Sequence, residues 1–177
     1  MVIASETGAL GIGISDSASR ANTHPTVTLD GDEVRRARVG EPVTLVAYVT
    51  DDDLPRRRRR RSTSEPDSAP KLTARQLRPP MRITVNKVVG LNLAWFVFRG
   101  EGTATFHPLQ VKVWEDTRTG ANSPWAPLWV APEVPEGGRY EVTVTFDRPG
   151  TYVMRGRADD GGLYADVQVT IVVGPVT

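Results

Sequence analysis

Apolar and polar residues alternate with a period of two through the last third of the chain. In Arg139–Phe146 the apolar positions are Tyr140, Val142, Val144 and Phe146, and in residues 164–173 they are Val167, Val169, Ile171 and Val173. This period, with one apolar face, is typical of a half-buried antiparallel strand. The turn formers Pro149-Gly150 and Asp160-Gly161 separate a further strand at residues 151–158. The segment therefore predicts three consecutive antiparallel strands.

The same alternation predicts strands earlier in the chain, at residues 26–29, 43–49, 81–85, 91–98, 103–106 and 109–114, and residues 34–39 lead into the Gly40-Glu41-Pro42 stretch. The strand at 91–98 is apolar on both faces, because Leu93 and Trp95 alternate with Ala94 and Phe96. We expect it to be covered on both sides and Trp95 to lie in the core.

Three sequence stretches resemble one fold family. Phe146-x-x-Pro149-Gly150-Thr151-Tyr152 followed by Ala158-Asp159-Asp160-Gly161 is similar to the closing strands of PKD-type and related immunoglobulin-like domains, including bacterial ones. Val39-Gly40-Glu41-Pro42-Val43-Thr44-Leu45 resembles their second-strand entry, and Leu93-Ala94-Trp95-Phe96 resembles their central Trp-bearing strand. The resemblance implies an all-β sandwich and implies no particular activity, because this fold hosts many unrelated roles.

The alternation fails in three segments. Residues 1–24 are rich in Gly, Ser and Ala, and we expect either a flexible tail or an extended arm that docks on a partner through Ile12 and Ile14. Residues 54–80 are a low-complexity insertion, and residues 115–138 are a second insertion with several prolines. The remaining residues, 25–177 without these insertions, are expected to form the sandwich.

Composition fits a soluble globular domain. The chain has 177 residues, 39% of them hydrophobic and 24% charged, which suits one domain of immunoglobulin type with large decorations. The absence of cysteine excludes a disulfide framework. No apolar run approaches the ~20 residues of a membrane span. Residues 1–5 lack the basic and apolar regions of a secretory leader, so we expect none in the given sequence. We expect an extracytoplasmic or membrane-peripheral location, and a cytoplasmic one stays open.

Charge is concentrated in the first insertion. Six consecutive arginines lie there: Arg56, Arg57, Arg58, Arg59, Arg60 and Arg61. The net charge of the whole chain is +1, so without these six positive charges the rest of the chain carries −5. Guanidinium groups bind carboxylates and phosphates in bidentate fashion. An acidic protein or an anionic membrane surface is therefore the expected partner, with a solvated loop as the alternative. Nucleic acid is disfavoured, because no aromatic residues interleave with the arginines and the remaining body is acidic.

Trp125 and Trp129 mark the second insertion. They suit a protein-interaction hot spot, a sugar-stacking platform, or an anchor that holds the loop to the core. Catalytic and metal chemistry have little support. The chain contains two histidines, His24 and His107, the second in an expected turn, and no nucleophile-elbow motif. The aspartates at 51–53 and 159–160 lack calcium-loop spacing, and we expect them to accept backbone hydrogen bonds in turns.

These observations predict an all-β, immunoglobulin-like antiparallel β-sandwich of seven to nine strands, with an N-terminal arm and two insertions. The predicted function is that of a non-enzymatic accessory or scaffolding subunit, without cofactor, that docks onto a larger protein assembly through the arm, the arginine run and the tryptophan loop. An extracytoplasmic carbohydrate- or ligand-binding module and a filament subunit that uses strand addition are the alternatives.

Overall fold

The computed structural model describes residues 17–54, 90–112 and 131–176. These segments form eight strands, a five-residue helix α1 (Ser17–Ala21) and a short 3₁₀ helix η2 (Glu136–Gly138). The strands are β1 (Thr26–Asp30), β2 (Val34–Arg38), β3 (Val43–Thr50), β4 (Asn92–Arg99), β5 (Ala104–His107), β6 (Arg139–Phe146), β7 (Gly150–Asp159) and β8 (Tyr164–Gly174).

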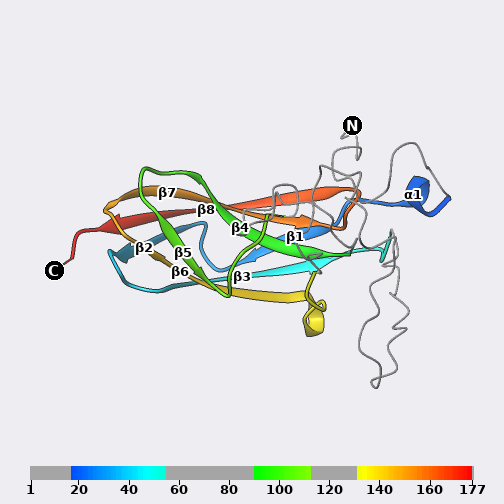
Figure 1. The fold of residues 1–177 in the computed structure, drawn as a ribbon, viewed down its shortest axis with the longest axis horizontal. Coiled ribbons are helices and arrows are strands. Elements are labelled where there is room, and N and C mark those ends of the chain that lie inside the picture. Colours follow the sequence, from blue (N-terminus) through cyan, green and yellow to red (C-terminus); the bar gives the residue numbers. More distant parts are fainter. Residues whose placement is uncertain (1–16, 55–89, 113–130, 177) are drawn as a thin grey trace, which may run out of the picture.

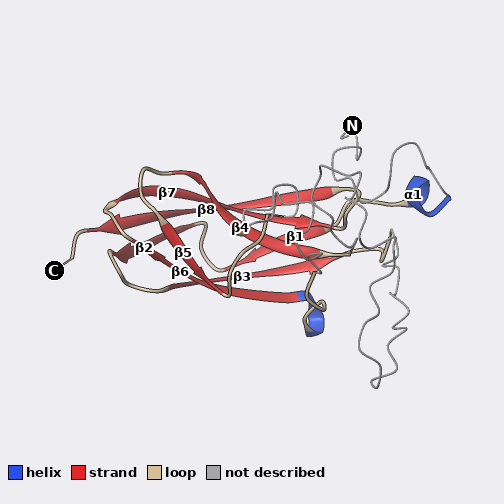
Figure 2. Cartoon of the chain, in the orientation of Figure 1, coloured by secondary structure: helices blue, strands red, loops and turns tan. Residues whose placement is uncertain are grey.

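The strands form two four-stranded sheets that pack face to face (Figures 1 and 2). Sheet 1 has the order β1-β3-β6-β5 and is antiparallel throughout. Sheet 2 has the order β2-β8-β7-β4, with β2 parallel to β8 and the other pairs antiparallel. Leaving β2 aside, these are the ABED and GFC sheets of an immunoglobulin constant-type domain, taken in chain order. The predicted immunoglobulin-like sandwich is confirmed, with one parallel pair that the sequence pattern did not indicate.

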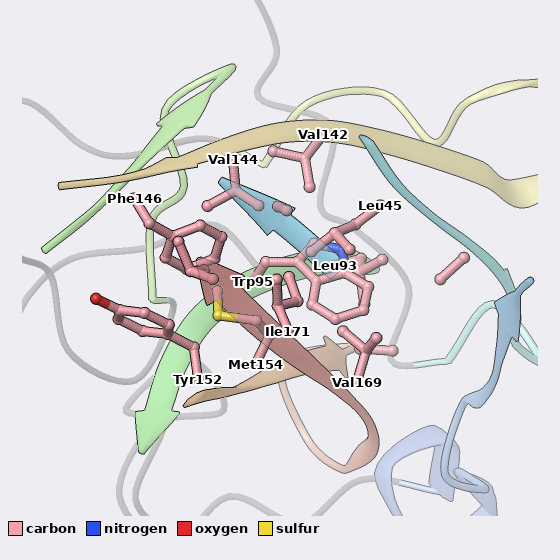
Figure 3. Packing of buried hydrophobic residues seen from close by; sticks show 14 of the residues in the cluster. Leu45, Leu93, Trp95, Val142, Val144, Phe146, Tyr152, Met154, Val169 and Ile171 are labelled. Carbon is pink, nitrogen blue, oxygen red and sulfur yellow. The ribbon is translucent and has the colours of Figure 1, made fainter. Parts of the chain in front are cut away.

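The inner faces of both sheets supply the core (Figure 3). Trp95 of β4 is only 2% exposed and packs among side chains that include Leu45, Val144 and Ile171. Gly156 lies directly opposite Trp95 on β7, and a Cβ at this glycine would stand 3.0 Å from the indole ring. The large ring therefore needs a residue without a side chain on the neighbouring strand. The prediction that Trp95 lies in the core is confirmed.

A tyrosine corner joins β6 to β7. The hydroxyl of Tyr152 donates to the carbonyl oxygen of Arg148 at 2.8 Å, four residues upstream, and its ring packs on Phe146 at a centroid distance of 4.4 Å. Gly102 leaves room for that hydroxyl, because a Cβ there would overlap it. The same corner is a hallmark of immunoglobulin-like sandwiches.

Three local predictions need correction. Residues 109–111 do not form the expected strand, and Lys112 makes only an isolated bridge. After the cis His107–Pro108 bond the chain leaves sheet 1, and the Gln110 side chain accepts a hydrogen bond from the backbone N of Trp95 at the β4 edge. His107 itself ends β5 rather than lying in a turn. Part of the predicted extended arm, Ser17–Ala21, is helical. The expected strand at residues 81–85 lies outside the described residues.

Candidate interaction surface

The residues predicted from the sequence to bind a partner all lie outside the described part of the chain, so their roles stay predictions. They are Ile12, Ile14, Arg56, Arg57, Arg58, Arg59, Arg60, Arg61, Trp125 and Trp129. The described residues contain a different cluster of arginines and aromatic rings, on the outer face of sheet 2.

Strand alternation puts these side chains on one surface. In β7, Tyr152, Met154 and Ala158 are buried in the core, so the intervening positions face outward. The cross-strand register brings outward positions of all four strands of sheet 2 together. The cations on this basic sheet face are Arg36 and Arg38 of β2, Arg99 of β4, Arg155 and Arg157 of β7, and the neighbouring Lys112, whose Nζ lies 5.5 Å from the Phe96 ring centroid.

Among the exposed outward positions of these four strands, Asp166 of β8 is the one acidic side chain. Arg157 binds its carboxylate with Nε to Oδ1 at 2.7 Å and Nη2 to Oδ2 at 2.8 Å. Arg155 reaches the same carboxylate, with Nη1 to Oδ2 at 3.5 Å. The hydrogen bonds to Asp166 raise the pKa of Arg157 above its ordinary, already high value, so this guanidinium stays charged. One carboxylate thus serves two arginines, and the surface keeps an excess of positive charge.

Aromatic rings hold the guanidinium groups flat against the sheet. The Cζ of Arg155 lies 3.6 Å from the ring centroid of Phe98, and the Cζ of Arg157 lies 3.9 Å from that of Tyr164. Phe98 is nevertheless 42% exposed. Arginine and aromatic residues are enriched in the energetically important centres of protein–protein interfaces. The exposed edges of these stacked arginines and rings present the same residue types to a partner.

A second polar cluster lies at the end of the sandwich that faces α1 (Figure 1). Asp160 is 1% exposed; its Oδ1 accepts from the backbone N of Gly162 and Leu163, and its Oδ2 accepts from Asn22 Nδ2 at 3.0 Å. Asp52 accepts from the backbone N and the hydroxyl of Thr23 at 2.9 and 2.7 Å. These contacts tie the segment before β1 to the loops at this end. The prediction that these aspartates accept backbone hydrogen bonds is confirmed for Asp51, Asp52, Asp159 and Asp160.

Burial raises the pKa of two carboxyls in this end cluster, whereas hydrogen bonds from Thr23 lower that of Asp52. Desolvation raises the pKa of Asp51 from 3.8 to about 6, and the charges of Asp160 and Asp52 add to the increase. Desolvation likewise raises the pKa of Asp160. No group of three or more His, Cys, Asp or Glu within residues 17–54, 90–112 and 131–176 is arranged to hold a metal ion. No helix in this part of the chain is both long and apolar enough to span a bilayer.

The basic sheet face could have been found in the sequence. The spacing Arg36-x-Arg38 and Arg155-x-Arg157 is the same period of two that marks the apolar face of each strand. The arginine run at residues 56–61 is the more conspicuous charge feature of the sequence, although it lies outside the described residues. The sequence does not reveal which strands are neighbours or their register, and these place both arginine pairs on one sheet.

Comparison with known proteins finds low similarity. No family model and no curated protein matches the chain. Among solved structures, domains 1–6 of the surface layer protein SbsC match 86% of this chain and 13% of that one, at 12% identity and a TM-score of 0.39. A PKD domain from human KIAA0319 matches 93% of this chain and 94% of that one, at 13% identity and a TM-score of 0.37.

The SrpA adhesin from Streptococcus sanguinis matches 87% of this chain and 58% of that one, at 13% identity and a TM-score of 0.35. The chain thus spans only a fraction of the S-layer and adhesin structures. Strand order, the central tryptophan and the tyrosine corner carry the assignment: the chain folds as an immunoglobulin-like β-sandwich.

Proposed function

We propose that this chain is a non-enzymatic interaction module that docks an acidic protein segment on the basic sheet face. The observation that carries the proposal is the arrangement of Arg155 and Arg157, both stacked on aromatic rings and both sharing the carboxylate of Asp166. Asp166 alone does not neutralise the two guanidinium groups, and a carboxylate of the partner neutralises the remaining positive charge.

The chemistry of the face favours a protein over a bilayer. A membrane surface attracts flexible lysines and arginines mainly by charge, whereas here the guanidinium groups are stacked and only partly exposed. Side chains of Arg155 and Arg157 are 19% and 16% exposed. Such preorganised groups suit bidentate recognition of carboxylates at defined positions. The arm, the arginine run and the tryptophan loop remain further proposed contacts, and an extracytoplasmic site of action remains part of the proposal.

Site-specific photocrosslinking tests the proposal in cells that make the protein. A benzophenone amino acid replaces Thr170, at the centre of the outer face of sheet 2, or Thr143, at the matching place on sheet 1. We expect the probe at Thr170 to capture one protein with an acidic segment, in a yield that falls with rising salt and falls severalfold in Arg155→Gln. The probe at Thr143 gives no such adduct.

Identical adducts from both positions, or none from Thr170, would contradict the docking proposal. Lipid adducts at Thr170 would replace the acidic protein with a membrane surface. Glycan adducts would favour the alternative of a carbohydrate-binding module.

A further inference from the structure

Residues 22–24, which we call the latch, lie between α1 and β1 and contact the end of the sandwich through two carboxyl groups. The side-chain N of Asn22 donates to Oδ2 of Asp160, in the turn after β7, at 3.0 Å. The backbone N and the hydroxyl of Thr23 donate to Oδ2 of Asp52, in the loop after β3, at 2.9 and 2.7 Å. The latch is therefore joined to two separate loops by hydrogen bonds to carboxylates.

A third carboxyl group, that of Asp51, belongs to the same cluster and has one oxygen without a partner in the described part of the chain. Its Oδ2 accepts from the backbone N of Asp53 at 3.2 Å, whereas its Oδ1 is buried and unpaired. Oδ1 of Asn22 is also buried and unpaired, and the donation from Nδ2 to Asp160 fixes the orientation of this amide. Both unpaired atoms are acceptors when Asp51 is ionised. A proton on Asp51 removes a buried charge and supplies a donor where two acceptors have none.

The electrostatics of the cluster also favour the protonated form of Asp51. Desolvation is the largest cause that raises its pKa, from 3.8 to about 6, and the negative charges of Asp160 and Asp52 add to the increase. The two hydrogen bonds from Thr23 lower the pKa of Asp52, so Asp52 stays ionised and keeps its contact with the latch. Asp51 is therefore the carboxyl of this cluster that changes charge near pH 6.

Further ionisable side chains lie on the segments that meet at this end of the sandwich: Arg20, His24, Asp53, Glu136 and Asp159. All of them except Asp159 are exposed, so water screens their charges. Asp159 is buried, and its Oδ1 accepts from the backbone N of Gly161 at 2.7 Å. The ionisation of Asp51 is therefore governed mainly by its own burial and by the two carboxylates that hold the latch.

We propose that the latch responds to pH: it rests against the end of the sandwich while Asp51 carries a proton, and it loosens when Asp51 ionises. Pro25, the residue after the latch, is fully buried, so it fixes the point from which the latch moves. The latch lies at the end of the sandwich and not on the basic sheet face, so the failure of one proposal leaves the other standing.

The docked latch is favoured at low pH. Loosening it lets water reach the carboxyl of Asp51 and returns the pKa toward 3.8, so the docked form binds the proton more tightly. The contribution of this proton to docking is complete below pH 3.8 and is lost as the pH rises through about 6. The full difference in pKa corresponds to on the order of 100-fold in the ratio of docked to loosened latch. We expect about tenfold, because Asp51 is partly exposed even in the docked form.

Backbone dynamics of the full-length, ¹⁵N-labelled protein test the proposal. The heteronuclear NOE of the Thr23 amide reports fast motion of the latch, and we expect it to be high under acidic conditions and to fall with a midpoint near pH 6. Asp51→Asn should keep the NOE high throughout, because the amide stays neutral. Asp53→Asn is the matched control: it removes a neighbouring exposed charge, and asparagine tolerates the φ of 61° at this position. It should follow the original protein.

A second measurement uses the reciprocal effect of the latch on the proton. Asn22→Ala removes the contact with Asp160 and favours the loosened latch, so the pKa of Asp51, followed through its carboxyl ¹³C shift, should move from about 6 toward 3.8. The proposal is overturned if the NOE of Thr23 stays constant while Asp51 titrates, or if Asp51→Asn shows the same fall as the original protein. It is equally overturned if Asn22→Ala leaves the titration of Asp51 unchanged.

Discussion

The two outer faces of this sandwich share a backbone plan and differ in chemistry. Each belongs to a four-stranded sheet. The outward positions of sheet 1 are rich in threonine, including Thr28, Thr44 and Thr145. Those of sheet 2 carry the stacked arginines. The threonine face is what β-propensity alone requires of an exposed sheet, whereas the arginine face needs a further reason.

One ion pair on each face makes the difference quantitative. Arg139 and Glu141 of sheet 1 are 2.6 Å apart with side chains 46% and 49% exposed, and Arg157 and Asp166 of sheet 2 are 2.7 Å apart with side chains 16% and 23% exposed. Water screens the first pair and reaches the second far less. Burial, and not the distance between the charges, therefore decides which pair matters for stability.

Asp166→Ala should have the largest effect among the substitutions that probe this comparison. It leaves Arg155 and Arg157 facing each other without their shared carboxylate, in a partly desolvated position. We expect the free energy of unfolding to fall by about 2 kcal/mol, less than the loss for a fully buried pair. Urea denaturation followed by tryptophan fluorescence measures it.

Glu141→Ala is the matched control on the threonine face. The pair it breaks is as short but exposed on both sides, and we expect no measurable change in the urea midpoint. Equal losses in the two variants would mean that the faces do not differ in screening, and the argument for a preorganised arginine surface would fail.

How far the sequence predicts this molecule depends on which interactions define each part. The strands, the buried Trp95 and the closing hairpins follow from local alternation and turn residues, so they were predictable. The parallel β2–β8 pair was not, because Val34–Arg38 shows no difference between parallel and antiparallel partners in so short a strand. The failed strand at residues 109–111 has an alternating pattern, but the Gln110 side chain accepts from the backbone N of Trp95 at the β4 edge, away from sheet 1.

The candidate sites depend on register and on burial, which alternation does not encode. Arg155 and Arg157 are visible in the sequence, yet their stacking on Phe98 and Tyr164 requires the cross-strand neighbours. Tyr140 was correctly assigned to the apolar face of its strand. That its hydroxyl is buried without a hydrogen-bond partner is evident only in the structure.

The aspartate cluster at the α1 end differs from both outer faces in its effect on the pH dependence of stability. The pKa of Asp51 rises from 3.8 to about 6, chiefly because the carboxyl is desolvated. The folded state therefore binds this proton more tightly than the unfolded state does. The resulting stability is complete below pH 3.8 and is lost as the pH rises through 6. Asp51→Asn should make the protein more stable at pH 7 by about 1 kcal/mol, after allowance for solvent screening of a partly exposed group.

The control is the difference in the free energy of unfolding between Asp51→Asn and the original protein, measured at pH 7 and at pH 4. Groups that titrate alike in both proteins cancel in this difference. The stability gain of Asp51→Asn over the original protein should shrink as the pH falls from 7 toward 4. A gain that is the same at both ends of this range would contradict the raised pKa.

The smallest expected effect concerns the stacking of Arg155 on Phe98. A double-mutant cycle with Phe98→Ala, Arg155→Ala and the double variant isolates the coupling between the two side chains. At a Cζ-to-centroid distance of 3.6 Å and with the ring 42% exposed, we expect a coupling of about 0.5–1 kcal/mol. Because a cation over a ring depends less on salt than a pair of opposite charges, the coupling should persist in 1 M NaCl while the Asp166 effect declines. A coupling near zero would mean that Phe98 is merely an exposed ring beside a charged neighbour, and the arginine face would then rest on Asp166 and Tyr164 alone.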